Sequence, residues 1–111
     1  MNRFDFIGNL TKDVELGKAG EVSLARFTLA VNRPYKNREG SYDADFIQLK
    51  AWREAGETIA KHVKKGDKLR VEGRVETSTY EKDGEKQYNT DFIVTGFEFL
   101  SSKKADNTES K

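Results

Sequence analysis

The stretch DFIQLKAWREAGETIAKHVKKGDKLRVEGRVETSTY, residues 45–80, decides the fold because its hydrophobic pattern changes period twice. In its first eight residues every second side chain suits a core, which is typical of a strand. Ala55, Ile59 and Val63 then follow at intervals of four, on one stripe of a short helix. Two lysines suit the last turn of this helix, and Gly66 suits the left-handed cap position after it. The alternation then returns, so the stretch predicts a strand, a short helix and another strand.

Two further strands precede this stretch. Residues 3–10 predict the first strand, and residues 24–33 predict the second, in which apolar side chains alternate with mostly polar ones. Regular pairing should end at Pro34, because proline cannot donate a hydrogen bond to a neighbouring strand. Residues 16–22 contain two glycines and predict a turn between these strands.

A hairpin closes the pattern at its C-terminal side. Asp83-Gly84 is a strong signal for a two-residue turn, and residues 87–100 predict a fifth strand, interrupted near Gly96. Closing the chain at this turn sets lysine opposite glutamate at both of the next two pairs of positions. The order of elements predicts an all-β OB-fold, a five-stranded Greek-key barrel with one short helix between strands three and four and a long final hairpin. The same order is also compatible with an open α+β sheet.

Length and composition restrict the class of protein. With 111 residues, the chain suits one domain, which we expect to cover residues 1–100, with residues 101–111 as a short disordered tail. Cysteine is absent and no segment resembles a signal peptide or a membrane span, so we expect a cytoplasmic protein. No nucleophile–base pair, phosphate-binding loop or zinc spacing is evident, so we expect no enzyme, no cofactor and no metal. The net charge of +1 gives no argument for nucleic acid.

Four aromatic residues occupy positions that burial in a barrel does not explain. Phe46 and Trp52 share the polar side of the third strand with a glutamine and a lysine, and Tyr80 has the same placement on the fourth strand. Tyr35 lies in a loop among basic residues. Scattered surface aromatics are common, and aromatics are also enriched in dimer interfaces. Rings interleaved with cations nevertheless suit single-stranded nucleic acid, whose bases stack on rings and whose phosphates attract cations.

Five segments occur in an order that resembles a known family. They are IGNLTKDVEL (7–16), ARFTLAVNRPYKN (25–37), ADFIQLKAW (44–52), AKHVKKGDKLRVEGRVETSTYEKDGE (60–85) and YNTDFIV (88–94). Together they resemble the bacterial-type single-stranded DNA-binding proteins, including phage- and plasmid-encoded members. The resemblance implies an OB-fold, usually a homotetramer, that coats and protects single-stranded DNA during replication, recombination or repair.

The resemblance also implies which residues bind DNA. The family's stacking positions correspond here to Tyr35, Phe46, Trp52 and Tyr80, where family members often have tryptophan at the first, second and fourth. Tyr88 is a candidate fifth ring that could instead pack within the hairpin. The candidate phosphate contacts are Arg33, Lys36, Arg38, Lys50, Arg53, Arg74 and Lys82.

The C-terminal segment departs from the family pattern. Members that recruit replication and repair proteins end in an acidic tip closed by Pro-Phe, whereas this sequence ends Thr-Glu-Ser-Lys. We therefore expect no recruitment through an acidic tail, as in a phage-encoded member, a competence-type paralogue or a truncated chain. Two alternatives remain: a primosome-type accessory protein of the same fold, and a protein-interaction module whose exposed aromatics form a partner surface.

Overall fold

The structure is a computed structural model that describes residues 1–100; the predicted tail, residues 101–111, lies outside the described residues. Six strands and one helix make up this part of the chain. They are β1 (Phe4–Leu10), β2 (Glu15–Ala19), β3 (Val22–Lys36), β4 (Tyr42–Trp52), α1 (Arg53–His62), β5 (Lys68–Lys82) and β6 (Glu85–Phe99).

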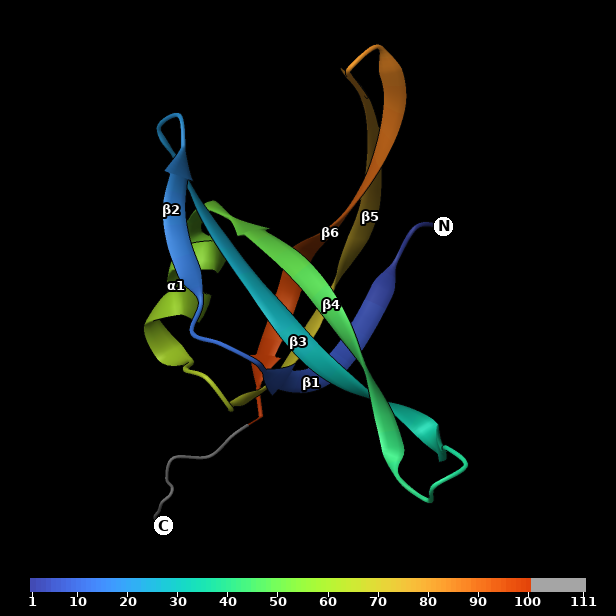
Figure 1. Cartoon of the computed structure of the whole chain (residues 1–111). Coiled ribbons are helices and arrows are strands. Elements are labelled where there is room, and N and C mark those ends of the chain that lie inside the picture. Colours follow the sequence, from blue (N-terminus) through green and yellow to red (C-terminus); the bar gives the residue numbers. More distant parts are fainter. Residues whose placement is uncertain (101–111) are drawn as a thin grey trace.

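Five of the strands close into a barrel. The sheet has the order β1-β5-β6-β4-β3-β2, and β1 also pairs with β3, where Asn9 lies opposite Ala30 and Leu10 opposite Leu29. This additional pairing joins the two ends of the series β1-β5-β6-β4-β3 (Figure 1). The predicted five-stranded barrel is therefore confirmed, and the open sheet is excluded.

The sixth strand, β2, contradicts the prediction of a simple turn over residues 16–22. β2 pairs antiparallel with β3 along its whole length, and only Gly20 and Glu21 connect the two strands. Gly20 has a φ of +68°, a conformation that glycine adopts without strain. All five residues of β2 are exposed, so no alternation of apolar side chains could mark it as a strand.

The core is formed by the side chains that the alternation assigned to it. Its fully buried large residues are Leu29, Leu49, Ile59, Leu69 and Val71. Four of them come from three barrel strands, and Ile59 comes from α1, which packs against β3 and β4. Burial of one such side chain stabilises the fold by roughly 1.5–3 kcal/mol.

Helix α1 is shorter than its sequence pattern predicts. It ends at His62, and the next residue, Val63, is extended but still buried. The two lysines that follow therefore lie beyond the helix, and Gly66, with a φ of +91°, belongs to the next turn. No helix among residues 1–100 is long and apolar enough to cross a membrane.

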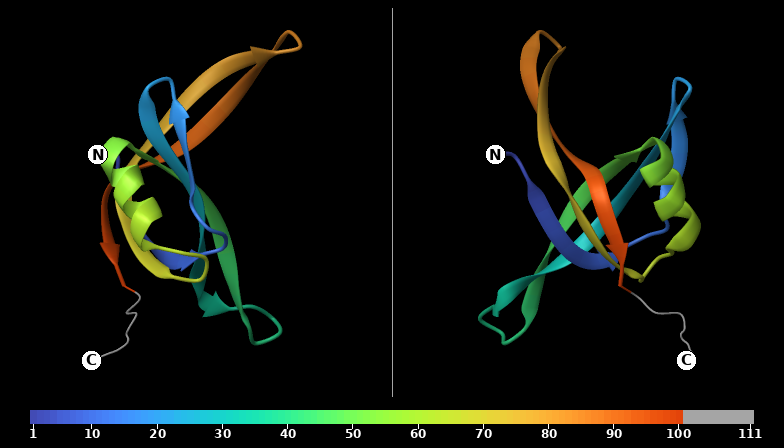
Figure 2. Two further views of the ribbon diagram at one scale, coloured as in Figure 1. Left: turned by 90° about the vertical axis from the view of Figure 1, so that its left-hand side faces the viewer. Right: turned by 180° about the vertical axis from the view of Figure 1, so that it is seen from behind.

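Two long hairpins, β3–β4 and β5–β6, project from the barrel in different directions, and the shorter β2–β3 hairpin projects as well (Figure 2). The longer of the two long hairpins is an arm formed by β5 and β6, and its turn is the predicted Asp83-Gly84, with φ values of +54° and +80°. Lys82 pairs with Glu85 and Glu81 with Lys86, which confirms the register predicted from charge. Positive φ at both central residues is the signature of a type I′ turn.

Irregular pairing occurs near the base of the β5–β6 arm and close to the turn of the β3–β4 hairpin. On β5–β6 the register shifts after Glu72, because Glu72 lies opposite Gly96 and Gly73 opposite Val94. A Cβ atom at Gly73 would clash with the carbonyl oxygen of Ile93, so the close approach requires glycine. On β3–β4 the register shifts across Pro34, as expected, although β3 itself continues beyond that residue.

Candidate nucleic-acid interface

Phe46 and Trp52 lie on the outer face of β4. The opposite face of this strand carries Leu49 and Ala51 into the core, so alternation directs the two rings away from it. Phe46 is 68% exposed and Trp52 is 37% exposed. Trp52 lies opposite the buried Leu24 and directly before α1, which accounts for its greater burial. Both rings nevertheless present surface to solvent.

Tyr35 and Tyr80 are exposed on the two hairpins. Tyr35, 60% exposed, belongs to the segment of β3 where pairing with β4 is interrupted. Tyr80, 52% exposed, lies on the arm and pairs with Gln87. The structure therefore places these two rings on projecting elements and the rings of β4 on the barrel.

Tyr88 lies on the other face of the arm from Tyr80. It pairs with Thr79, the neighbour of Tyr80, and successive residues of a strand point to opposite sides. Tyr88 is 76% exposed, so the expectation that it might instead pack within the arm is wrong. A ligand that lies on one face of the arm cannot contact both tyrosines, whereas an extended ligand that wraps around the arm can contact both.

A groove with a volume of about 420 Å³ lies beside the outer face of β4. It is lined by Gln48 and Lys50, which alternate with core residues between Phe46 and Trp52 on the strand. The remaining walls come from Lys12, Asp13 and Glu15, from β3, and from residues 89–91 in the middle of β6. The groove is mainly polar and takes its position from the β3–β4 and β4–β6 pairings.

Lys50 forms an ion pair inside this groove. Its ammonium nitrogen lies 3.2 Å from a carboxylate oxygen of Asp91, and both side chains are more than two-thirds buried. The pair links β4 to β6, which run parallel here with Lys50 opposite Ile93. The carboxylate therefore fixes the position of the cation and partly neutralises it.

Arg33 is held in the same way by Asp45. The guanidinium donates hydrogen bonds to both carboxylate oxygens, at 2.9–3.3 Å. This hydrogen bonding lowers the pKa of Asp45 below its usual value and raises the pKa of Arg33. Both groups are exposed enough for a phosphate to approach the arginine.

The other predicted phosphate contacts are spread over the two hairpins and α1. Lys36 and Arg38 are exposed on the β3–β4 hairpin, Lys82 is exposed at the end of the arm, and Arg53 is the first residue of α1. On the outer face of the arm, the Nε atom of Arg74 lies 3.6 Å from a carboxylate oxygen of Glu76. The structure thus brings Lys50 into the groove, whereas the other predicted cations lie outside its lining, on the two hairpins and at the start of α1.

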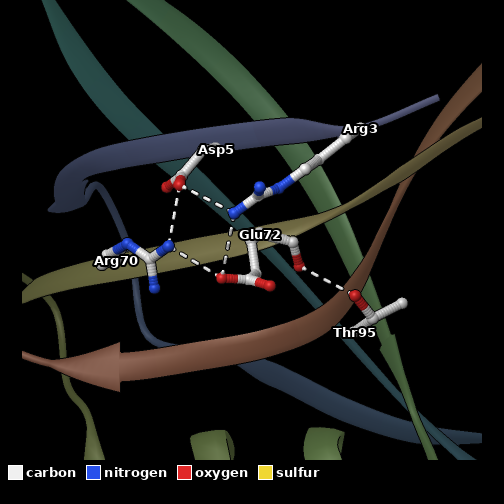
Figure 3. Close-up of polar contacts among 5 residues, drawn as sticks. All are labelled: Arg3, Asp5, Arg70, Glu72 and Thr95. Carbon is white, nitrogen blue, oxygen red and sulfur yellow. Dashed lines mark hydrogen bonds and ion pairs between the residues drawn. The ribbon is translucent and has the colours of Figure 1, made fainter. Parts of the chain in front are cut away.

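A second charged cluster lies away from the groove, on β1 and β5 (Figure 3). Asp5 and Glu72 lie directly opposite each other in the β1–β5 pairing. Arg70 contacts both carboxylates at 2.7 Å, and Arg3 contacts both at 3.5 Å. The hydrogen bonds to Asp5 and Glu72 raise the pKa of Arg70. These arginines offset the repulsion between two carboxylates, so they serve strand pairing.

Three groove and hairpin residues escaped the sequence prediction. Arg26 lies opposite Lys50 in the β3–β4 register and lines the groove together with Lys12. Tyr42, the first residue of β4, is 56% exposed. The alternation of β4 could have identified Tyr42, because it has the same parity as Phe46. No comparable signal marked Lys12, whose role depends on the tertiary approach of its loop.

The arrangement is suited to binding rather than to catalysis. Exposed rings offer flat apolar surfaces, and the groove offers hydrogen-bonding groups together with the cations Lys12, Arg26 and Lys50. Within residues 1–100 no group of three or more histidine, aspartate or glutamate side chains could hold a metal ion. The chemistry offered here is stacking, hydrogen bonding and charge neutralisation.

Comparison with known proteins identifies related chains. The sequence model described as "Single-strand binding protein family" matches residues 1–100. "Single-stranded DNA-binding protein 3" of Listeria innocua is 49% identical over 107 residues, covering 94% of this chain and 66% of the relative. "Single-stranded DNA-binding protein 1" of Streptococcus pyogenes is 42% identical over 110 residues, covering 97% of this chain and 83% of the relative. A "Single-stranded DNA-binding protein" of Clostridium perfringens is 47% identical over 105 residues, covering 92% of this chain and 67% of the relative.

Proposed function

Because the chain belongs to the single-strand binding protein family, we propose that it binds single-stranded DNA without sequence preference and without catalysing a reaction. One observation carries this proposal: Phe46 and Trp52 are exposed on the outer face of β4, with the polar groove beside the residues between them. Every base has a flat apolar face, so exposed rings bind bases regardless of sequence. Duplex DNA hides these faces, which favours single strands over duplexes.

The cations around the rings supply the second part of the binding energy. In the proposed complex, Lys50 and the basic residues of the hairpins neutralise phosphates, together with Arg26 in the groove. Before DNA binds, the charges of Arg33 and Lys50 are partly compensated by the carboxylates of Asp45 and Asp91. In the proposed complex, a phosphate replaces each carboxylate as the partner of the cation. Affinity should therefore fall with salt, but less steeply than the number of basic residues alone suggests.

The proposed role is to coat and protect single strands during replication, recombination or repair. The relatives are named for binding single-stranded DNA, which supports the binding on which this role depends, and the match covers 66% of the length of the Listeria relative. The cytoplasmic, nucleoid-associated location remains a prediction from the sequence. So does the absence of recruitment through the tail, because that tail lies outside the described residues.

Assembly into a homo-oligomer, in particular a homotetramer, is part of the proposal. Family membership supports it, and so does the outer edge of β1, which pairs with β3 only at Asn9 and Leu10. The rest of this edge, residues 4–8, has no strand partner on that side within the described chain, so a second copy could pair there. Sedimentation equilibrium should give four times the mass of one chain, whereas the mass of one chain would contradict the assembly.

The binding proposal is tested by fluorescence anisotropy with labelled oligo-dT and with a labelled duplex of equal length. We expect tight binding to oligo-dT and much weaker binding to the duplex. A salt titration should give a negative log–log slope, at roughly −0.7 for each phosphate neutralised. Equal affinity for both DNA forms, or an affinity for oligo-dT that salt does not change, would contradict the proposal.

A further inference from the structure

The arm leaves the barrel at the pair Val75–Phe92, which we call the base of the arm. On one side of this pair, β4 pairs with β6 at Phe92. On the other side, the backbone pairing of β1 with β5 ends at Phe4 and Gly73, before it reaches Val75. Within the described chain, residues 76–91 have no third strand beside them, so the direction of the arm depends on how its base is held.

Asn2 holds the base of the arm on the side that β1 leaves unpaired. Its side-chain nitrogen donates a hydrogen bond to the carbonyl oxygen of Val75 at 2.6 Å, and its side-chain oxygen accepts one from the backbone N–H of Val75 at 2.8 Å. Continuing the β1–β5 register by two residues beyond Phe4 and Gly73 brings Asn2 opposite Val75. The side-chain amide, which donates and accepts as a peptide group does, therefore replaces the backbone of a neighbouring strand.

Tyr80 depends on the direction of the arm because it lies on β5, five residues beyond Val75. At about 3.4 Å per residue, the two residues are roughly 17 Å apart, so a rotation of about 10° at the base would move the ring by roughly 3 Å. A gap of about 1 Å already loses up to half of a van der Waals contact. An isolated two-stranded hairpin is only marginally stable in water, so the arm needs this support from the sheet.

Asn9 offers a comparison for the ordinary structural role of such a hydrogen bond. It lies near the other end of β1, and its side-chain nitrogen donates to the carbonyl oxygen of Gly66 at 3.0 Å. Like the bonds of Asn2, this bond is exposed and joins a side chain to a distant backbone. Neither Asn9 nor Gly66 lines the groove or belongs to the arm, so the loss of this bond affects stability alone.

We propose that Asn2 is a positioning residue for DNA binding, which holds the base of the arm and thereby keeps Tyr80 in place before a strand arrives. This inference rests on the proposed binding of single-stranded DNA. Figure 1 shows the N-terminal end of the chain beside β5, where the arm leaves the barrel. A ring that is already held in place loses less conformational freedom when a base stacks on it, so Asn2 raises affinity without contacting the DNA.

The test measures binding to an oligo-dT series of increasing length, and Tyr80→Ala first shows which lengths use the arm. At those lengths Asn2→Ala should weaken binding about 3- to 10-fold, because freedom of the arm must then be lost on binding. At lengths that Tyr80→Ala leaves unchanged, Asn2→Ala should bind like wild type. Asn9→Ala is the matched control, which should lower Tm about as much as Asn2→Ala does and bind like wild type at every length.

Two further variants separate positioning from a general effect on the fold. The double variant Asn2→Ala/Tyr80→Ala should bind as weakly as Tyr80→Ala alone, because a residue that acts through the ring has no effect once the ring is gone. Asn2→Asp keeps an acceptor for the N–H of Val75 but has no donor for its carbonyl oxygen. Its affinity should lie between those of wild type and Asn2→Ala at the lengths that use the arm.

The motion of the arm is measured directly with a fluorophore attached at Thr79→Cys. The chain contains no cysteine, so the label reports on the arm alone. The nanosecond decay of its anisotropy should have a larger amplitude in Asn2→Ala than in wild type or Asn9→Ala. An equal amplitude in all three proteins would overturn the positioning role.

The binding data can overturn the same role independently of the proposed function. Additive losses in the double variant, or unchanged binding of Asn2→Ala at every length, would do so while wild type still binds oligo-dT. The absence of any effect of Tyr80→Ala would have the same meaning. If wild type does not bind oligo-dT, the proposed function fails as well.

Discussion

Phe46 and Trp52 have the same orientation on β4 but differ in how much of each ring is exposed. Phe46, 68% exposed, can contribute to binding without contributing much to the core, whereas Trp52, 37% exposed, contributes to both. Their orientation was predictable from alternation alone. Their difference in burial was not, because it depends on the packing of β4 against Leu24 and the start of α1.

Phe46→Ala should weaken binding to oligo-dT by roughly 1–3 kcal/mol and leave the free energy of unfolding unchanged. Trp52→Ala should weaken binding by a similar amount and also lower stability, by less than the roughly 3–5 kcal/mol typical of a fully buried ring. Anisotropy titrations and urea unfolding measure the two effects. Phe46→Tyr, which keeps a ring, is the control for binding. Global unfolding of Phe46→Ala would show that the residue belongs to the core.

Asp91→Asn should strengthen binding. The substitution removes the carboxylate that holds Lys50 and leaves the shape of the groove nearly unchanged. A partly exposed ion pair is worth up to about 1 kcal/mol, so affinity should rise about 2- to 5-fold, and the salt slope should become more negative by up to about 0.7. Glu21→Gln, in the exposed turn between β2 and β3 and outside the groove, is a control that removes one negative charge elsewhere. Weaker binding of Asp91→Asn would show that the carboxylate orients Lys50 for the phosphate.

The Arg33–Asp45 pair should make stability depend on pH in the acid range. The folded pKa of Asp45 is lower than its unfolded pKa, so the pair stabilises the fold above the unfolded value, near pH 4, and this contribution disappears as the pH falls through the folded value. The stability difference between wild type and Arg33→Met should therefore be largest near neutral pH and vanish in acid. Urea unfolding at a series of pH values measures it, and a difference independent of pH would contradict the assignment.

The sequence predicted every strand and helix that has a buried face, and it missed β2, which has none. Periodicity identified all five barrel strands and α1, because each of them carries side chains into the core. β2 escaped because its residues are all exposed and backbone pairing alone makes it a strand. The groove likewise depends on the parallel approach of β6 to β4, which local sequence does not encode.

The arm should use its two tyrosines unequally. Tyr80 shares its face with Asp91 of the groove, since Tyr80 pairs with Gln87 and alternate residues of β6 share a side, whereas Tyr88 faces the other way. Tyr80→Ala should therefore weaken binding to oligo-dT by roughly 1–3 kcal/mol, and Tyr88→Ala should weaken it less. Anisotropy titrations measure both, and a larger effect of Tyr88→Ala would place the DNA on the opposite face of the arm.

At the scale of the whole molecule, one closed barrel supports two long hairpins and a groove (Figures 1 and 2). Closure depends on the contact of β1 with β3 at only two residue pairs, which no local pattern reveals. The order of elements nevertheless predicted the barrel, because few folds combine these strands with one helix at this position. The rigid barrel fixes the rings of β4, and the hairpins carry the remaining binding groups outward.

The central claim is that outward-facing rings on β4 stack on unpaired bases, and the intrinsic fluorescence of Trp52 tests it most directly. Trp52 is the only tryptophan in the chain, so the whole tryptophan signal reports on this site. We predict that oligo-dT strongly quenches the emission, because a stacked thymine contacts the indole, and that a duplex of equal length changes it little. Emission that oligo-dT leaves unchanged, under conditions in which anisotropy shows binding, would contradict the account.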